Sequence, residues 1–139
     1  MNISTSTIPS IQAELLGFAL TLPEAYEDRP WGETVVKVRG KIFLFWSDAP
    51  TALAFSLKLP RSHGYALSLP YAKPTGHGLG KSGWVSFHTT IDTALEVPLV
   101  KEWIIESYRA VAPKKLVAQI VSIQSVEEVS HAETDLAAG

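Results

Sequence analysis

The chain has 139 residues, near the commonest length of one domain, and 46% of them are hydrophobic while 19% are charged. This composition excludes a disordered chain, and the lack of cysteine excludes a disulfide framework and thiolate chemistry. Twelve Lys and Arg against 14 Asp and Glu give a net charge of −2, which argues against a general coat for nucleic acid or membranes.

The first predicted element is a helix that Thr7 or Ser10 can cap and that ends at Pro23, a residue that cannot continue a helix. Apolar residues recur along this stretch at the spacing of one helix face. They are Ile8, Ile11, Leu15, Ala19 and Leu22.

We expect no targeting signal at the beginning of the chain. Met1–Ser10 contains no Lys or Arg, so it lacks the charged region of a signal peptide. The apolar run Leu15–Leu22 has eight residues, whereas a membrane span needs about 20. We therefore expect a cytoplasmic protein without a membrane partner.

Three strands are predicted between Glu33 and Lys58, where apolar and polar residues alternate with a period of two. The loop Glu24–Gly32 precedes them. Arg39-Gly40 is expected to form a tight hairpin turn, because Gly40 adopts positive φ without steric cost.

The register expected for this hairpin pairs Val38 with Lys41 and Val36 with Phe43. The opposite face of the hairpin then carries Val35, Lys37, Ile42, Leu44 and Trp46. An apolar second face on a small sheet is typically covered by something, most simply by another copy of the chain. The pattern therefore favours a homodimer or a protein partner.

The rest of the chain is predicted to contain both helices and strands. The predicted elements are a short helix over Pro60–Leu69, a short strand near Tyr71, a strand over Trp84–His88, a long helix from Pro98 to Ala112 and further helical turns over Lys114–Ile123. Together they predict the α+β class, with an antiparallel sheet and helices gathered on one face in two layers. We expect a single domain over residues 1–139, with a core of about 8–120 and a frayed acidic tail over 127–139.

No motif indicates an enzyme. Gly76–Ser82 ends like a phosphate-binding loop, but Thr75 stands where the first glycine belongs, and a strand follows instead of a helix. Gly80–Trp84 lacks the last glycine of a nucleophile elbow. The four histidines are not at metal-ligand spacing. We expect no catalytic residue, no metal and no cofactor.

Charge is distributed unevenly along the chain. The span from Arg29 to Lys81 carries +6, whereas the flanks together carry −8. A basic sheet and its loops could face phosphates, with Trp84 and His77 available for stacking or hydrogen bonds. The alternative is a solvated sheet edge whose lysines discourage edge pairing. The candidate nucleic-acid-binding residues are Lys37, Arg39, Lys41, Lys58, Arg61, Lys73, His77, Lys81 and Trp84.

Five short segments, in this order and spacing, resemble the MmcQ/YjbR family of small bacterial proteins. They are Leu22-Pro23-Glu24, Val38-x-Gly40-Lys41-x-Phe43, Ser56-Leu57-Lys58, Gly80-Lys81-x-x-Trp84 and Glu106-Ser107-Tyr108. The resemblance implies the element order α-β-β-β-α-β-β-α and a DNA-binding role for a double-wing-like fold. The family pattern contains no catalytic residues.

Two hypotheses follow. In the first, the basic wings bind DNA without sequence specificity, through phosphates. In the second, the chain is a homodimeric protein- or peptide-binding module, as the likeness of the fold to secretion chaperones implies. A contiguous basic surface would favour the first, and an exposed apolar patch around Ile42, Leu44 and Trp46 would favour the second.

Overall fold

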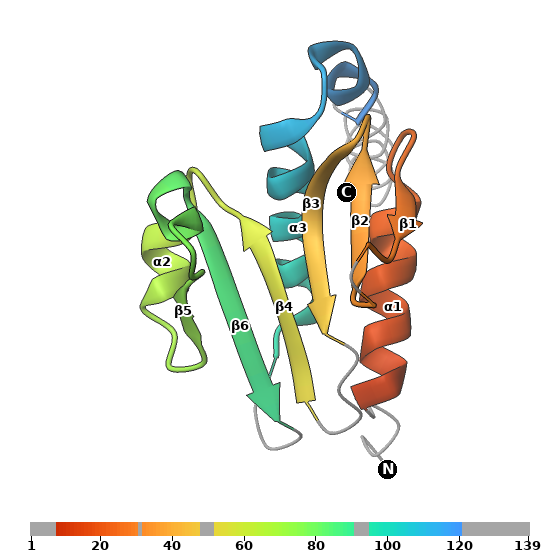
Figure 1. Cartoon of the computed structure of the whole chain (residues 1–139). Coiled ribbons are helices and arrows are strands. Elements are labelled where there is room, and N and C mark those ends of the chain that lie inside the picture. Colours follow the sequence, from red (N-terminus) through yellow and green to blue (C-terminus); the bar gives the residue numbers. More distant parts are fainter. Residues whose placement is uncertain (1–7, 31, 48–51, 91–94, 121–139) are drawn as a thin grey trace, which may run out of the picture.

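The computed structural model describes residues 8–30, 32–47, 52–90 and 95–120. Figure 1 shows a twisted sheet with helices behind it. The helices are α1 (Ile8–Leu20), α2 (His63–Leu67) and α3 (Val97–Val111), with the 3-10 helix η2 (Leu79–Ser82). The strands are β1 (Tyr26–Asp28), β2 (Thr34–Val38), β3 (Lys41–Ser47), β4 (Ala52–Lys58), β5 (Ala72–Pro74) and β6 (Trp84–Thr90). Residues 114–120 form a further helical segment.

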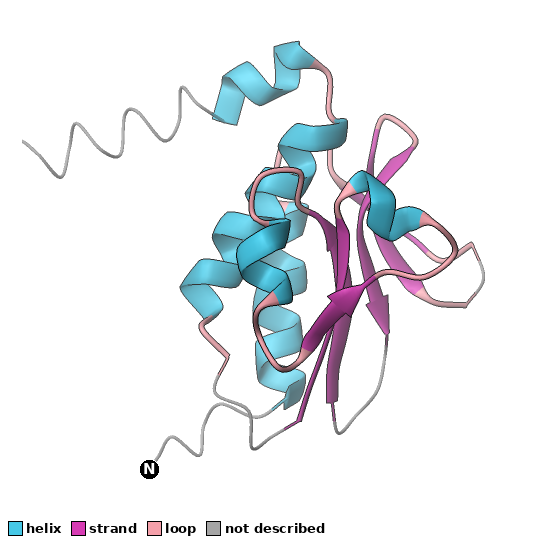
Figure 2. Cartoon of the chain, turned by 90° about the vertical axis from the view of Figure 1, so that its left-hand side faces the viewer, coloured by secondary structure: helices cyan, strands magenta, loops and turns pink. Residues whose placement is uncertain are grey.

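The six strands form one sheet in the order β1-β2-β3-β4-β6-β5, and every neighbouring pair is antiparallel. The long helices α1 and α3 contact each other and lie on one side of the strands (Figure 2). The predicted α+β class, with an antiparallel sheet and helices on one face, is therefore confirmed. We call the sheet face opposite α1 and α3 the open face.

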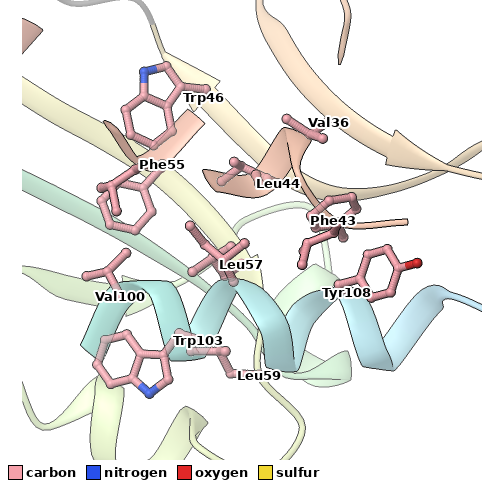
Figure 3. Packing of buried hydrophobic residues seen from close by; sticks show 14 of the residues in the cluster. Val36, Phe43, Leu44, Trp46, Phe55, Leu57, Leu59, Val100, Trp103 and Tyr108 are labelled. Carbon is pink, nitrogen blue, oxygen red and sulfur yellow. The ribbon is translucent and has the colours of Figure 1, made fainter. Parts of the chain in front are cut away.

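A stack of aromatic rings fills the core between the sheet and α3. Trp46, Phe55, Phe87 and Trp103 follow one another with ring centroids 5.3, 4.9 and 5.4 Å apart and nearly parallel planes. All four side chains are buried. Figure 3 shows Trp46 and Phe55 on the sheet side and Trp103 on the helix below them. Because these rings come from β3, β4, β6 and α3, the stack joins the two layers.

The hairpin of β2 and β3 contains a bulge that the sequence pattern does not predict. Its turn is as expected, with φ of 51° at Arg39 and 81° at Gly40, and Val38 pairs with Lys41. The register then shifts, so that Val36 pairs with Leu44 and not with Phe43. A two-residue turn fixes only the first pairs of a hairpin, and one extra residue reverses every face assignment beyond it.

The shifted register sends both Phe43 and Leu44 into the helix-covered core, where each is fully buried. Phe43 meets Tyr108 edge-on at 5.3 Å (Figure 3). Trp46 lies on the same side. The predicted apolar patch on the second face is therefore wrong for Leu44 and Trp46. Ile42 remains on that face, half-buried, and so does Val35, which pairs with Phe45 and is fully buried. Self-association stays a prediction, but it loses two of the four apolar residues on which it rested.

The other elements differ from prediction mainly in short pieces. The segment expected to be a loop, 24–32, contains the three-residue strand β1, which pairs with β2. The predicted short helix, the strand near Tyr71, the strand from Trp84 and the long helix are all present. The predicted acidic tail lies outside the described residues. Within the described part of the chain, no helix is long and apolar enough to cross a membrane.

Three consecutive residues of α3 hold the layers together by hydrogen bonds. Glu106 accepts from the backbone N–H groups of Arg61 and Ser62, at 2.9 Å each, and from the Ser62 hydroxyl. Ser107 donates to the carbonyl of Phe43 and accepts from the N–H of Lys58. These bonds attach α3 to β3, to β4 and to the segment that leads into α2.

The third residue of this group, Tyr108, donates its hydroxyl hydrogen to the carbonyl of Pro23 at 2.7 Å. A tyrosine hydroxyl is protonated at neutral pH, and burial raises the pKa of this phenol further above its ordinary value of 10.

Gly80 also has a structural role, because a Cβ there would lie 2.9 Å from Cβ of Pro74. Several segments that carry the family resemblance therefore serve packing.

Candidate nucleic-acid interface

The open face contains a hollow of about 560 Å³ that runs across β3, β4, β6 and β5. The register defines one row across its floor, in which Phe45, Ser56, Ser86 and Lys73 are successive neighbours. The next row carries Ser47, Ala54 and His88, and Glu33 lines the wall before β2. The central side chains are small, and that is why the sheet is hollowed here.

Three hydroxyl groups form a connected row beside this hollow. The Ser86 hydroxyl lies 2.7 Å from that of Ser56 and 2.9 Å from that of Thr75. Each hydroxyl has one hydrogen to donate and two lone pairs. Two bonds inside the row use two of the three hydrogens, so one hydrogen is left for an outside acceptor, and lone pairs remain for an outside donor.

The aromatic side chains of the open face have different exposures. Trp84 is only 7% exposed and packs against Phe45 with ring centroids 5.3 Å apart at an angle of 65°. Phe45 is half-buried and lines the hollow. Trp84 therefore supports the ring of Phe45 and does not itself offer a stacking surface, which differs from the role that the sequence suggested for it.

Three of the candidate lysines are placed near the first half of β6. Lys58 is the β4 partner of Trp84, and Lys73 is the β5 partner of Ser86. Lys81 is exposed on η2, which directly precedes β6 and contacts it. No carboxylate among the described residues forms an ion pair with any of the three. His77, exposed in the loop between β5 and η2, completes this group.

Two other candidate basic side chains form ion pairs with carboxylates. The Lys37 ammonium lies 2.8 Å from a carboxylate oxygen of Asp28, and this hydrogen bond raises the pKa of Lys37 and lowers the pKa of Asp28. The Arg39 guanidinium donates two hydrogen bonds to the carboxylate of Glu24, at 2.6 and 3.0 Å. Both bases are therefore neutralised locally and contribute little to a phosphate-binding surface.

The last two candidate bases lie away from the hollow. Lys41 is exposed at the start of β3. Arg61 lines a second hollow of about 370 Å³ with Glu102, Glu106 and Arg109. The two charge signs are mixed there, and Glu106 already accepts hydrogen bonds from Arg61 and Ser62. This second hollow suits an anion poorly.

Sequence reasoning missed most of the hollow. Phe45 escaped notice because the register without the bulge would place it with Phe43 on the core face. Ser56 and Ser86 are 30 positions apart in the sequence, and only the pairing of β4 with β6 joins them. The alternation of small polar residues in these two strands is the one signal that could have indicated the hollow. Among the described residues, no cluster of His, Asp and Glu is arranged to hold a metal ion.

Comparison with known proteins identifies the family. The crystal structure of a Deinococcus radiodurans protein with a DUF419 domain is similar to this chain, with a TM-score of 0.57 and 24% identity, over 70% of this chain and 75% of that one. This likeness concerns the fold alone. No curated protein shows a significant match. A family model described as YjbR matches residues 20–110, which include all five segments quoted from the sequence. The chain belongs to the YjbR family.

Proposed function

We propose that this chain is a non-enzymatic module that binds nucleic acid on its open face, mainly through phosphates and without sequence specificity. The observation that carries the proposal is the group of Lys58, Lys73 and Lys81, which gather around the start of β6 without acid partners among the described residues. Lysine and arginine contacts to phosphates supply most of the affinity of such binding.

The structure reduces the number of expected phosphate contacts. Nine side chains were candidates in the sequence, of which three lysines and His77 lie around β5, η2 and the start of β6 with no acid partner among the described residues. Each phosphate contact releases roughly 0.7 to 0.9 counterions, depending on whether the nucleic acid is single-stranded or double-stranded. The logarithm of the binding constant should therefore fall with the logarithm of salt concentration at a slope of about −2 to −3.

Binding of a fluorescent oligonucleotide over a salt series tests the proposal. In the double variant Lys58→Ala/Lys81→Ala, the salt slope should become shallower by up to about two units. The matched control is Lys41→Ala/Lys114→Ala, which removes the same charge from exposed positions outside the lysine group. Equal effects of the two double variants, or no binding by the wild-type protein at low salt, would contradict the proposal.

A further inference from the structure

The hollow has the size and lining of a small-molecule site. Its volume of about 560 Å³ lies within the range of about 300 to 1,000 Å³ that is usual for ligand pockets. One end of the floor is the half-buried ring of Phe45, which packs against Trp84. The rest of the floor contains small side chains, among them Ala54 and Ser86. A flat ring could lie on this floor against Phe45.

The polar groups around the hollow differ from one end to the other. Lys73 stands at the β5 end, close in register to the hydroxyl row of Ser56, Ser86 and Thr75. Glu33 stands at the opposite end, before β2. An anionic group is attracted to the lysine end, and a hydrogen-bond donor is attracted to the carboxylate of Glu33. The site is therefore suited to a ligand with a phosphate at one end and amino hydrogens at the other.

We propose that this hollow receives one unpaired nucleobase of a single-stranded nucleic acid, stacked on Phe45. This inference rests on the proposed function and specifies its ligand. A base in a duplex has both faces covered by its neighbours, so it cannot stack on a protein ring, whereas a base in a single strand can. Hydroxyl groups that both donate and accept fit the mixed edge of any base.

The carboxylate of Glu33 adds a preference among the bases. It accepts hydrogen bonds from the exocyclic amino groups of adenine, cytosine or guanine, whereas thymine offers only its N3–H, which lies between two carbonyl oxygens that repel a carboxylate. Single strands of cytosine or adenine should therefore bind more tightly than single strands of thymine at the same length and salt concentration.

The first test compares a short single-stranded oligo-dC with a duplex of the same length by fluorescence anisotropy. The wild-type protein should prefer the single strand. Phe45→Leu, which keeps an apolar side chain, should weaken single-strand binding about 5- to 100-fold and leave duplex binding unchanged, because one base–aromatic stack is lost. Phe45→Tyr keeps the ring and should retain the preference. Circular dichroism checks that each variant is folded.

The second test compares oligo-dC with oligo-dT in the Glu33→Gln variant. The ratio of the two affinities should shrink toward one, while the salt slope changes little. If Phe45→Leu does not fold, the ratio of oligo-dC to oligo-dT affinity in Glu33→Gln still tests whether a base occupies the hollow. The Phe45→Tyr variant then tests whether an aromatic ring at this position preserves the single-strand preference.

The outcomes separate the inference from the proposed function. Equal, salt-dependent binding of single strand and duplex with no effect of Phe45→Leu would overturn the stacked-base site and leave phosphate binding in place. Equally tight binding of an acidic peptide of the same charge would also overturn it. Absence of binding to every nucleic acid, including the single strand at low salt, would overturn the proposed function together with the inference.

Discussion

The two faces of the sheet use their polar and aromatic groups in opposite ways. On the side of α3, the side chains of Glu106, Ser107 and Tyr108 form hydrogen bonds with backbone groups of other elements. The aromatic stack on this side is buried. On the open face, Ser86 bonds to other half-buried hydroxyls, and Phe45 is partly exposed. The first arrangement holds the fold together, whereas the second leaves bonding capacity for a ligand.

This contrast predicts that truncations on the helix-covered side cost far more stability than truncations on the open face. The largest losses of stability are expected for the two core residues at the bulge, Phe43 and Leu44. Phe43→Ala should lower the free energy of unfolding by about 3–5 kcal/mol and Leu44→Ala by about 2–5 kcal/mol, because both side chains are fully buried. Ile42→Ala should cost less than either, because this side chain is only half-buried. Urea titrations check this order, and a small cost for Leu44→Ala would indicate the register without the bulge, in which Leu44 lies on the open face.

A second comparison removes one hydroxyl from each side. Ser107→Ala leaves a buried carbonyl of Phe43 and the N–H of Lys58 without their partner, so it should destabilise by about 1–3 kcal/mol. Ser86→Ala should cost about 1 kcal/mol or less, because its hydroxyl neighbours are only part-buried and water can replace it. Equal costs in thermal unfolding would mean that the hydroxyl row is structural and not available to a ligand.

A third substitution tests the effect of a buried polar group on the helix-covered side of the sheet. Thr89 is 1% exposed, and its hydroxyl has no hydrogen-bond partner among the described residues. It faces the core beside Leu53. Thr89→Val removes this unsatisfied hydroxyl and keeps the shape, so it should stabilise the fold by about 1 kcal/mol. A loss of stability in the same urea assay would mean that the hydroxyl is bonded in solution.

The smallest expected effect concerns the exposed ion pairs. The hydrogen bond from Arg39 lowers the pKa of Glu24 below its ordinary value of 4.5. Such a carboxylate stabilises the folded state above the ordinary pKa, and this contribution is lost as the pH falls through the lower, folded value. Glu24→Gln should therefore flatten the acid side of the stability profile slightly, since exposed pairs contribute little. An unchanged profile would mean that this pair does not persist in solution.

Much of the fold can be predicted from the sequence. The 3.6-residue period of the long helix and the alternation in 52–58 indicate the correct elements, because they reflect local burial. The hairpin register could not be predicted in this way. A bulge adds one residue without a local composition signal, so Leu44 and Trp46 were assigned to the wrong face.

The candidate site was less predictable, because its charges are decided by contacts between distant residues. Arg39 and Glu24 are separated by 15 positions, and the fold places Arg61 in a second hollow together with Glu102 and Glu106. Lys37 is neutralised only because the short strand β1 brings Asp28 beside it. The charge pattern alone therefore counted several bases that the fold neutralises or turns away.

Backbone amide NMR during titration with a short single-stranded oligonucleotide tests most directly whether the open face is the binding surface. We predict shifts concentrated at Ser56, Ser86 and His88 and at the lysine group, in a salt-dependent manner. The amides of Ile104 and Ser107, on the helix-covered side, should move little. Shifts concentrated along α3, or spread evenly over both faces of the sheet, would contradict the account.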